Sequence, residues 1–580
     1  MAEKTRTWRF ELVFLLLAAT LVALGTRLAV LVRDQRDQVV DLALRQETIS
    51  MPIPARVGSI YGSTRGRYVL LAGSHQVPSC FVDPGLLEDR QVGDVAVAVA
   101  RVLNISAWEV QQTIFHRRNT RFAWVKRGIT RREADEVRAL GIRAVGITYE
   151  WRRQYPNGPL GCDVLGFRRR DGVAGGGLEL ALDGHLSAKD GRRVMLADAR
   201  RRPIWSVPEK CSLPRDGRNV YLCVDAVIQG FLQEAVTSTA AEFGAEWATG
   251  IVMDPHTGEI LAMCSAPTFN PNRYNTADPN HMTNHVIVSP YEPGSVFKPI
   301  IAAAAVQLGR VSYDSVIPIG QYNGVYHADR GGRISDHGKT YDDLTVEDGV
   351  VHSSNILMSK LGEMLGNERL HRVVRAFGFG QETDVPLRGE CAGIIRDLRK
   401  WDGYSLRRVP FGQEVSTTSM QLTTAFAALV NGGELLRPRL VSRITDPNGQ
   451  VVYRGQRQVV RRLLSPQVSR RTREVLGQVV ERGTGKRCRL SRWSSFGKTG
   501  TAQVSGPGGY PPGQYTGSFI GGAPVEKPAV ICLISVYRPD PSRGYYGGTV
   551  AAPYVRDVLE RTLQYLQVPS DRTEEMALRP

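Results

Sequence analysis

The segment from Leu12 to Val32 places the strongest constraint on this chain, because it reads LVFLLLAATLVALGTRLAVLV and carries Arg27 as its only charge. About 20 consecutive apolar residues are enough for a helix to cross a lipid bilayer. Arg27 lies near one end of the segment, where its long side chain can reach the lipid headgroups. The sequence therefore predicts a single N-terminal transmembrane helix over residues 11–32.

A cleaved signal peptide is the alternative interpretation, since Ala23-Leu24-Gly25 is an acceptable cleavage site. We favour an uncleaved anchor because the apolar character continues to Val32. The positive-inside rule only leans towards a cytoplasmic N-terminus at residues 1–10. Basic residues flank the segment on both sides, at Lys4, Arg6, Arg9, Arg33 and Arg36.

The charge of the chain is unusual, whereas its 42% of hydrophobic residues is ordinary for a globular protein. Among 580 residues, 74 Lys and Arg against 57 Asp and Glu leave a net charge of +17. Such a surface suits nucleic acid, membrane lipid or a phosphate-bearing substrate. We expect no nucleic-acid partner, because the sequence has no zinc-finger spacing, no RNP-like aromatic block and no lysine-rich arm.

The eight cysteines show neither a CxxC pair nor a metal-ligand spacing with histidine, so we expect no metal site. No other feature of the chain calls for a cofactor. If the bulk of the chain is outside the cytoplasm, Cys211 and Cys223 could pair, but scattered buried thiols fit equally well. The sequence leaves these two alternatives open.

The stretch YEPGSVFKPI, residues 291–300, combines a nucleophile, a potential base and a helix start. An apolar run follows and stops at Gly309, and Pro299 is tolerated only in the first turn of a helix. Ser295 is therefore expected at or near the helix N-terminus. Because residues three apart on a helix share a face, we expect the amine of Lys298 to reach the Ser295 hydroxyl. Burial and the helix dipole would lower the pKa of this lysine and make it a better base.

A second element, Ser353-x-Asn355, lies in a stretch whose apolar residues keep helical spacing. On such a helix Ser354 would point about 100° away from Ser353. We therefore expect Ser354 to take no part in a site that Ser353 lines.

A third element lies in SSFGKTGTAQV, residues 494–504, which reads as a strand. Ser495 precedes Lys498 by three residues, but residues three apart in a strand point to opposite faces, so these two cannot cooperate. The candidate site residues of this strand are Lys498, Thr499, Gly500 and Thr501.

The rest of the chain divides into two predicted domains and a tail. Residues 33–215 read as a mixed, β-rich domain with short strands and turns rich in Gly and Pro. Residues 216–568 contain a β-hairpin at 247–265, two later strands, and an amphipathic last helix that would pack on the sheet. Residues 569–580 read as a disordered tail.

The three elements in this order resemble the penicilloyl-serine transferase superfamily, which contains the penicillin-binding proteins and the serine β-lactamases. The stretch 217–568 resembles their transpeptidase domain throughout, including FGFG, FGQEVSTTSMQL, ERGTGK and GGTVAAP. PARVGSIYGSTRG, FAWVKRGIT, RQYPNGPLGCDVLGF and GGLE resemble the pedestal of class B, the monofunctional membrane-anchored enzymes. Where that class usually has Arg-Gly-Ser-Ile-x-Asp-Arg, this chain has Arg-Val-Gly-Ser-Ile-Tyr-Gly at 56–62, a departure that touches only the pedestal.

The resemblance implies an α+β fold: one transmembrane helix, a mixed β-rich pedestal of the dimerisation type, and a transpeptidase domain with a central antiparallel sheet flanked by helices. The compact length resembles the cell-division type more than the elongation type. A bifunctional class A enzyme is not expected, because the signature Glu-Asp-x-x-Phe-x-x-His is absent.

The resemblance also implies a role for each catalytic residue. Ser295 attacks the carbonyl between the two terminal D-alanines of a stem peptide, and Lys298 takes its proton. Ser353 passes a proton to the leaving amine, while Asn355 holds the lysine and the substrate amide. Lys498 keeps the site positive.

The strand residues next to this lysine bind substrate in the same scheme. The Thr499 and Thr501 hydroxyls, with Gly500 between them, hold the terminal carboxylate, and the backbone N–H groups of Ser295 and Thr501 form an oxyanion hole. An amine from a neighbouring strand resolves the acyl-enzyme and forms the crosslink, and a β-lactam stays attached.

The implied partners are peptidoglycan stem peptides, β-lactams, the membrane, a glycan polymerase of the SEDS kind, and other cell-wall or division proteins. The catalytic domain is expected on the outer side of the cytoplasmic membrane. Two alternatives remain open: a non-catalytic scaffold or β-lactam sensor that keeps the fold, and a hydrolytic D,D-carboxypeptidase or β-lactamase.

Overall fold

The structure is a computed structural model. It describes residues 2–198, 203–328, 332–337, 339–506 and 509–572. Contacts divide the chain into two units, which we describe separately. The first unit comprises 1–56 and 188–216, and the second comprises 57–187 and 217–580. Much of the predicted pedestal therefore groups with the predicted transpeptidase domain, because strands from both share one sheet.

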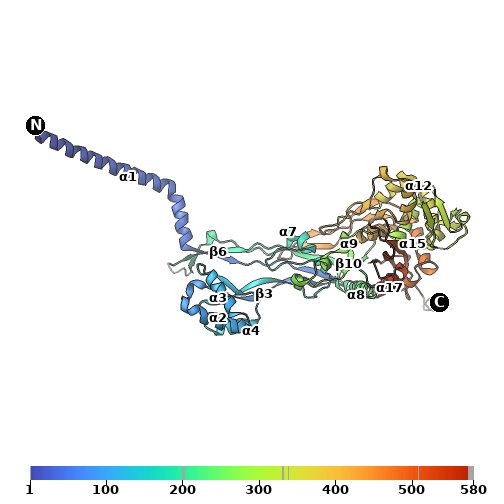
Figure 1. The fold of residues 1–580 in the computed structure, drawn as a ribbon, viewed down its shortest axis with the longest axis horizontal. Coiled ribbons are helices and arrows are strands. Elements are labelled where there is room, and N and C mark those ends of the chain that lie inside the picture. Colours follow the sequence, from blue (N-terminus) through green and yellow to red (C-terminus); the bar gives the residue numbers. More distant parts are fainter. Residues whose placement is uncertain (1, 199–202, 329–331, 338, 507–508, 573–580) are drawn as a thin grey trace. The chain divides into compact units, whose positions relative to one another are not determined.

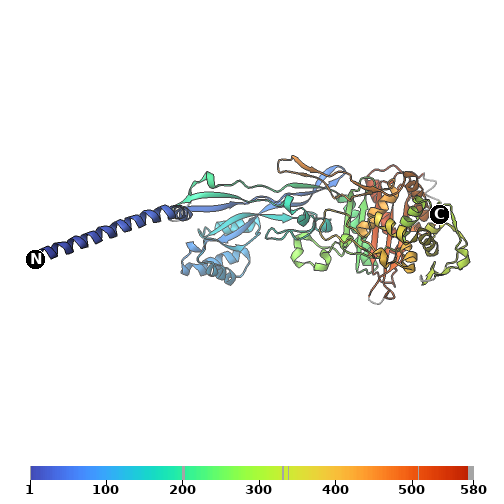
Figure 2. The ribbon, with the colours of Figure 1, turned by 90° about the horizontal axis from the view of Figure 1, so that it is seen from above.

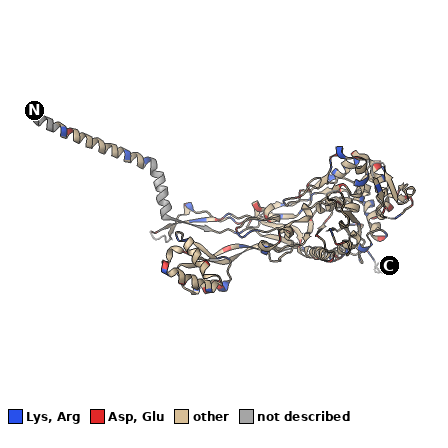
Figure 3. Ribbon diagram, in the orientation of Figure 1, with Lys and Arg blue, Asp and Glu red and all other residues tan. Residues whose placement is uncertain are grey.

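The first unit begins with a long helix, α1 (Ala2–Glu47), which contains the apolar stretch Trp8–Leu31 with a mean hydropathy of 2.2. The apolar side chains of this stretch are exposed, and Figure 3 shows a long uncharged part of the helix. Within the described residues, α1 is the only helix long and apolar enough to cross a membrane. The predicted N-terminal apolar helix is confirmed, and it continues past Val32.

The first unit also contains a three-stranded antiparallel sheet in the order β1-β6-β7. Its strands are β1 (Thr48–Ile53), β6 (Gly191–Ala197) and β7 (Pro203–Ser206). Cys211 lies close to this sheet, where its thiol donates a hydrogen bond to the Val207 carbonyl at 3.2 Å. All eight cysteines are free in the structure, and six of them are buried, whereas Cys211 and Cys391 are partly exposed.

The second unit begins with a small domain built on the long strand β3 (Arg67–Val82). This strand pairs with two others, and three helices pack nearby. These elements are β4 (Ala123–Lys126), β5 (Val145–Gln154), α2 (Asp89–Leu103), α3 (Ala107–His116) and α4 (Arg131–Ala139). Helix α2 buries Val92, Ala96, Val99 and Leu103, whose spacing of three or four residues forms one apolar face.

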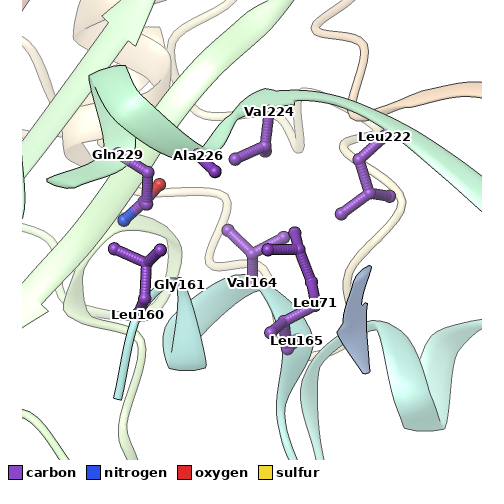
Figure 4. A pocket seen from close by; sticks show the side chains of 9 residues that line it. All are labelled: Leu71, Leu160, Gly161, Val164, Leu165, Leu222, Val224, Ala226 and Gln229. Atoms are coloured by element: carbon purple, nitrogen blue, oxygen red, sulfur yellow. The ribbon is translucent and has the colours of Figure 1, made fainter. Parts of the chain in front are cut away.

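Strand β3 also belongs to a seven-stranded sheet that joins the small domain to the rest of the second unit. Besides β3, β4 and β5, this sheet contains β2 (Ile60–Thr64), β8 (Asn219–Asp225), β18 (Val441–Thr445) and β19 (Val451–Arg454). Figure 4 shows a small apolar pocket at this junction, lined by Leu71 of β3, Leu222 of β8 and residues of α5 (Cys162–Leu165). Side chains from both predicted domains therefore share one core.

A five-stranded antiparallel sheet in the order β10-β9-β23-β22-β21 is the centre of the second unit. Its strands are β9 (Trp247–Met253), β10 (Ile260–Ala266), β21 (Phe496–Gln503), β22 (Tyr515–Ala523) and β23 (Val530–Tyr537). The predicted hairpin, the predicted strand at 494–504 and the two predicted strands after it are confirmed. Strand β21 lies at one edge of the sheet.

Helices cover both faces of this sheet (Figure 2), because β9, β10, β22 and β23 each contribute apolar residues to a core on either side. On β23, Cys532 and Ile534 face α8 (Ala226–Glu242) and α17 (Ala552–Tyr565), which lie side by side in Figure 1. Ile531 and Leu533 face the opposite core. That core contains α10 (Lys298–Gln307), α12 (Asn355–Ala376), α14 (Ser419–Val430) and α15 (Pro466–Glu481).

The end of the chain continues beyond α17 with ordered contacts. The Asp571 carboxylate accepts hydrogen bonds from Ser494, and the Arg572 guanidinium pairs with Glu481. The predicted tail thus contributes at least these two residues to the folded unit, and 573–580 lie outside the described residues.

Candidate active site

Ser295 lies on the short 3-10 helix η5 (Gly294–Phe297), which leads directly into α10. Pro299 stands in the first turn of α10, as predicted. Gly294 has φ of +55°, and a Cβ at this position would lie 2.9 Å from the Thr501 carbonyl oxygen. The glycine therefore allows the serine turn to lie directly against β21.

Gly500, on β21, also permits this close approach because it has no side chain. A Cβ at this position would lie 2.5 Å from Ser518 Oγ, 3.0 Å from the Pro293 carbonyl oxygen and 3.1 Å from Val296 Cγ1. Because η5 lies this close to β21, Ser295 and Thr501 stand on two adjacent elements, and so do their backbone N–H groups.

The Lys298 side chain is fully buried, and its amine donates three hydrogen bonds. The acceptors are the Ser353 carbonyl oxygen at 2.5 Å, Ser353 Oγ at 3.1 Å and Asn355 Oδ1 at 2.7 Å. Burial lowers the pKa of Lys298 to about 7, although the nearby Asp336 carboxylate acts in the opposite direction. A lysine in this state can exchange a proton near neutral pH.

The expected contact between Lys298 and Ser295 is not present. Among the described residues no hydrogen bond uses the Ser295 hydroxyl, and the lysine amine is occupied by Ser353 and Asn355. Helical spacing places the two side chains on one side of the turn, but it does not determine where a long side chain finds its acceptors. Ser295 is only partly buried, so its hydroxyl is open to a substrate.

The second element is a turn rather than a helix interior, and this corrects the sequence-based expectation. Ser353 has φ of +62° and lies between α11 (Val346–Val351) and α12. Ser354 is the N-cap of α12, where its Oγ accepts a hydrogen bond from Leu357 N at 3.1 Å. Ser354 is therefore part of the support of the site and not a neutral neighbour of it.

Asp336 holds this turn in place. Its buried carboxylate accepts hydrogen bonds from Ser354 Oγ at 2.7 Å, Asn355 N at 2.6 Å and Ile356 N at 3.1 Å. These backbone groups belong to the first turn of α12, which has no intrahelical partners for them. Asn355 Nδ2 also donates to the Ser335 carbonyl at 2.8 Å, which turns Asn355 Oδ1 towards Lys298.

Lys498 approaches the same serine from β21. Its fully buried amine donates to Ser353 Oγ at 3.0 Å and to the Thr499 carbonyl at 3.2 Å. Burial, and then the charge of Lys298, lower the pKa of Lys498 well below its usual range. Two lysine amines therefore share one hydroxyl oxygen, and both cannot carry a full charge without cost.

Thr499 and Thr501 follow on the strand, on the opposite face from Lys498. Thr499 Oγ1 is hydrogen-bonded to Thr484 Oγ1 at 2.8 Å, and Thr501 Oγ1 accepts a hydrogen bond from Gly547 N at 3.2 Å. Thr484 lies in the block ERGTGK, and Gly547 begins the block GGTVAAP. Both blocks are part of the family resemblance, and these contacts show what they do in the fold.

The structure thus brings Lys298, Ser353, Asn355 and Lys498 into one hydrogen-bonded group, with Ser295 one turn away. Ser495 is not part of this group, because its hydroxyl donates to the Cys488 carbonyl. Among the residues for which coordinates are described, no group of three or more His, Cys, Asp or Glu could hold a metal ion. An accessible serine one turn from a buried, low-pKa amine is the combination of groups that serine acyl transfer uses.

Sequence reasoning missed Asp336, Ser335 and Ser354. Ser335 is the last residue of β13 (Gly332–Ser335), and Asp336 follows it directly, in a stretch that reads only as polar. No local pattern links them to residues 354–356, so only the folded contact identifies their part in the site.

Two family models match this chain. The penicillin-binding protein transpeptidase domain matches residues 248–560, and the penicillin-binding protein dimerisation domain matches residues 52–222. The chain therefore belongs to the penicillin-binding protein family, and it is a class B member more like the cell-division type.

Relatives and solved structures agree with this assignment. Stage V sporulation protein D of Bacillus subtilis is 30% identical over 97% of this chain and 86% of its own length. The peptidoglycan D,D-transpeptidase FtsI of Escherichia coli is 27% identical over 86% of this chain and 82% of its own length. Penicillin-binding protein 3 of Mycobacterium tuberculosis, solved in complex with aztreonam, has a TM-score of 0.69 and 26% identity, covering 90% of this chain and 98% of the other.

Proposed function

We propose that this protein is a serine D,D-transpeptidase that crosslinks peptidoglycan stem peptides and is acylated by penicillins. The observation that carries the proposal is the convergence of Lys298 and Lys498 on Ser353 Oγ, one helical turn from the open hydroxyl of Ser295. A scaffold without activity has no use for two buried amines, whose burial is costly. An acyl-transfer enzyme uses them to move protons.

In the first half-reaction, Ser295 Oγ attacks the carbonyl between the terminal D-alanines and its proton passes to neutral Lys298. The amide C–N bond breaks, an ester to Ser295 forms, and D-alanine leaves after its nitrogen receives a proton through Ser353. The Ser353 hydroxyl accepts from both lysines, so it can relay a proton between them. The backbone N–H groups of Ser295 and Thr501 are the proposed oxyanion hole, whose donors typically contribute about 10²–10³ in rate.

In the second half-reaction, an amine of a neighbouring strand attacks the ester. A new amide bond forms, and the proton of the amine returns to Ser295 Oγ through Lys298. A β-lactam opens its ring in the first half-reaction, and no leaving group departs. Asn355 holds Lys298 and the substrate amide, and Thr499, Gly500 and Thr501 are proposed to bind the terminal carboxylate.

We also propose that residues 11–32 cross the cytoplasmic membrane once, with 1–10 inside and the catalytic unit outside, where crosslinking takes place. The apolar helix and its exposed side chains support the single crossing. A SEDS-type glycan polymerase and other division proteins are the proposed partners.

Labelling with a fluorescent penicillin tests the proposal. We expect a covalent label that peptide mapping places on Ser295, and no label on Ser295→Ala. Ser495→Ala is the matched control, because it removes the serine of the other Ser-x-x-Lys pair and should leave labelling intact. A label elsewhere, or none on the folded protein, would show that the chain does not act through Ser295.

The acceptor is tested separately, because the geometry of Ser295 serves water and amines alike. A stem pentapeptide ending in D-Ala-D-Ala is incubated with the protein, with and without an amine acceptor. The products are then identified by their masses. A transpeptidase forms the peptide–amine adduct. Loss of D-alanine without an adduct would identify a carboxypeptidase.

A further inference from the structure

Beside β5 of its small domain, the second unit contains a buried group of charges that the proposed reaction does not use. Glu179, whose side chain is fully buried, is held by Arg153 Nε at 2.6 Å and Arg168 Nε at 3.0 Å. Each nitrogen of the Arg168 guanidinium has a partner, since Arg168 also binds Asp183 and the Gly172 carbonyl oxygen, each at 2.7 Å. These contacts make the group rigid.

Arg153, by contrast, is not saturated. Its side chain is only 4% exposed, and its Nη1 donates to the Gly58 carbonyl at 2.7 Å. Its Nη2 is buried without a hydrogen-bond partner among the described residues. An unpaired buried donor on a charged group is unfavourable, so this nitrogen indicates a missing acceptor.

A cavity of about 480 Å³ lies beside this arginine, within the size range of small-ligand sites. Six of the residues that line it are arginines, and the only acidic residue in its lining is Glu150. The arginines are Arg127, Arg152, Arg153, Arg168, Arg169 and Arg170.

The charges of this cluster do not balance. Ion pairs with Glu150, Asp171, Glu179 and Asp183 occupy four of the six arginines. Neither Arg152 nor Arg170 forms an ion pair with any other residue that the structure describes. Two guanidinium charges are therefore left in excess beside a buried donor.

The polar groups around the cavity are otherwise already bound. Tyr274 is fixed by stacking on Phe167 with ring centroids 4.8 Å apart, and its hydroxyl accepts a hydrogen bond from Arg170 N at 3.1 Å. Asn272 pairs with the backbone of Tyr155 through both its Oδ1 and Nδ2. The free binding capacity consists of arginine donors, with no free carboxylate to hold a cation.

We propose that this pocket binds a phosphate-bearing ligand, with Arg152, Arg153 and Arg170 as its donors. Guanidinium groups bind phosphate oxygens through paired N–H groups, and an excess of two charges matches a dianion better than a single carboxylate. The ligand oxygen would supply the acceptor that Arg153 Nη2 lacks. A free phosphate or diphosphate and the headgroup of an anionic phospholipid share this chemistry.

Calorimetry on the full chain in a neutral detergent tests the proposal with two probes. One is inorganic diphosphate, and the other is dihexanoyl phosphatidylglycerol below its micelle-forming concentration. The test variant is Arg152→Gln/Arg170→Gln, which removes the two excess charges but keeps the buried ion pairs. The control is Arg131→Gln/Arg143→Gln, which removes two exposed arginines of the same domain that do not line the pocket.

We expect the wild type and the control to bind at least one probe, and the test variant to bind about 10²-fold more weakly, as expected when two charge-assisted hydrogen bonds are lost. Binding of both probes would indicate that the phosphate group alone is recognised, and binding of the phospholipid alone would identify a membrane headgroup as the source. Arg152→Lys/Arg170→Lys, which keeps the charge, should recover part of the affinity. This recovery also separates a lost ligand contact from a folding defect.

Three results would overturn the proposal. The first is that neither probe binds, and the second is that the test variant and the control bind equally. The third is that hexaglutamate binds more tightly than either probe, which would indicate an acidic protein partner. Penicillin labelling should be unchanged in all variants, so failure here is distinguishable from failure of the acyl-transfer proposal.

Discussion

Replacing Ser353 with alanine removes the one hydroxyl that both buried lysines share. Lys298 keeps two acceptors, the Ser353 carbonyl oxygen and Asn355 Oδ1, while Lys498 keeps only the Thr499 carbonyl oxygen. The substitution therefore breaks the connection between the two amines but leaves each with a partner. The left-handed φ of +62° is equally unfavourable for serine and alanine, so it adds no new strain.

We expect Ser353→Ala to reduce stability only modestly but to reduce the acylation rate strongly. Each lost hydrogen bond to a charged group is worth about 1.5–3 kcal/mol at most, and the remaining acceptors compensate part of it. We expect the free energy of unfolding to fall by about 1–3 kcal/mol, which is within the usual range for point mutants. Acylation should slow by about 10²–10⁴, the typical contribution of a positioned proton-transfer group.

The assay compares penicillin acylation rates and thermal unfolding for three variants. Ser359→Ala is the matched control, because Ser359 is buried on α12 and donates to the Arg407 carbonyl at 2.8 Å without touching a lysine. It should lose about 1 kcal/mol of stability and acylate normally. Ser354→Ala removes the N-cap and one partner of Asp336, so it should lose about 0.5–2 kcal/mol and acylate at an intermediate rate. Equal acylation by Ser353→Ala and Ser359→Ala would refute the proton relay.

Four further outcomes follow from the same contacts. Because the pKa of Lys298 lies near 7 and its neutral form is the base, acylation should fall about tenfold per pH unit below pH 7 and level off above it; a flat profile from pH 5 to 8 would exclude this lysine as the base. The pKa of Lys298 is lower in the folded than in the unfolded chain, so between about pH 7 and 10.5 the unfolded chain binds more protons. This lysine therefore raises the free energy of unfolding as pH rises through that window. A free energy of unfolding, measured with denaturant, that falls steadily there would contradict the burial argument. Asp336→Asn should cost about 1–3 kcal/mol and slow acylation, since an amide nitrogen cannot accept the bonds that α12 and Ser354 donate; unchanged melting and labelling would show that the turn does not depend on it. Gly500→Ala should destabilise by about 1–3 kcal/mol and reduce penicillin labelling, because its Cβ would displace η5; wild-type melting and labelling would show that the close approach of η5 to β21 is not needed.

Local chemistry made some parts of the fold predictable. The apolar run of α10, Pro299 in its first turn and the hairpin strands β9 and β10 each follow from short-range patterns of period 3.6 or 2. The same patterns separated Lys498 from Ser495, which the structure bears out, because the two side chains find different partners.

The remaining parts depend on contacts between distant segments. Ser353 takes a left-handed conformation because Asp336, from an unrelated hairpin, fixes the following turn, and no helix-spacing rule anticipates that. For the same reason the partners of Lys298 were not predictable. Its amine binds Ser353 and Asn355, which lie 55 and 57 residues away, rather than the Ser295 hydroxyl three residues before it. The grouping of the small domain with the catalytic unit likewise results from pairing of β2 with β8.

The shared hydroxyl of Ser353 makes the site sensitive to the charge of whatever enters it. With no anion present, a second proton on the lysine pair is repelled by the first, so the resting site favours a single positive charge. In the proposed reaction, a peptide that ends in a free carboxylate would supply a compensating charge beside Lys498, which would keep Lys498 an ammonium and leave Lys298 as the neutral base. In that scheme the stem peptide itself releases the base that activates Ser295. A donor whose terminus is an amide should bind without this gain, and its acylation rate should respond to pH at a different midpoint from that of the free acid.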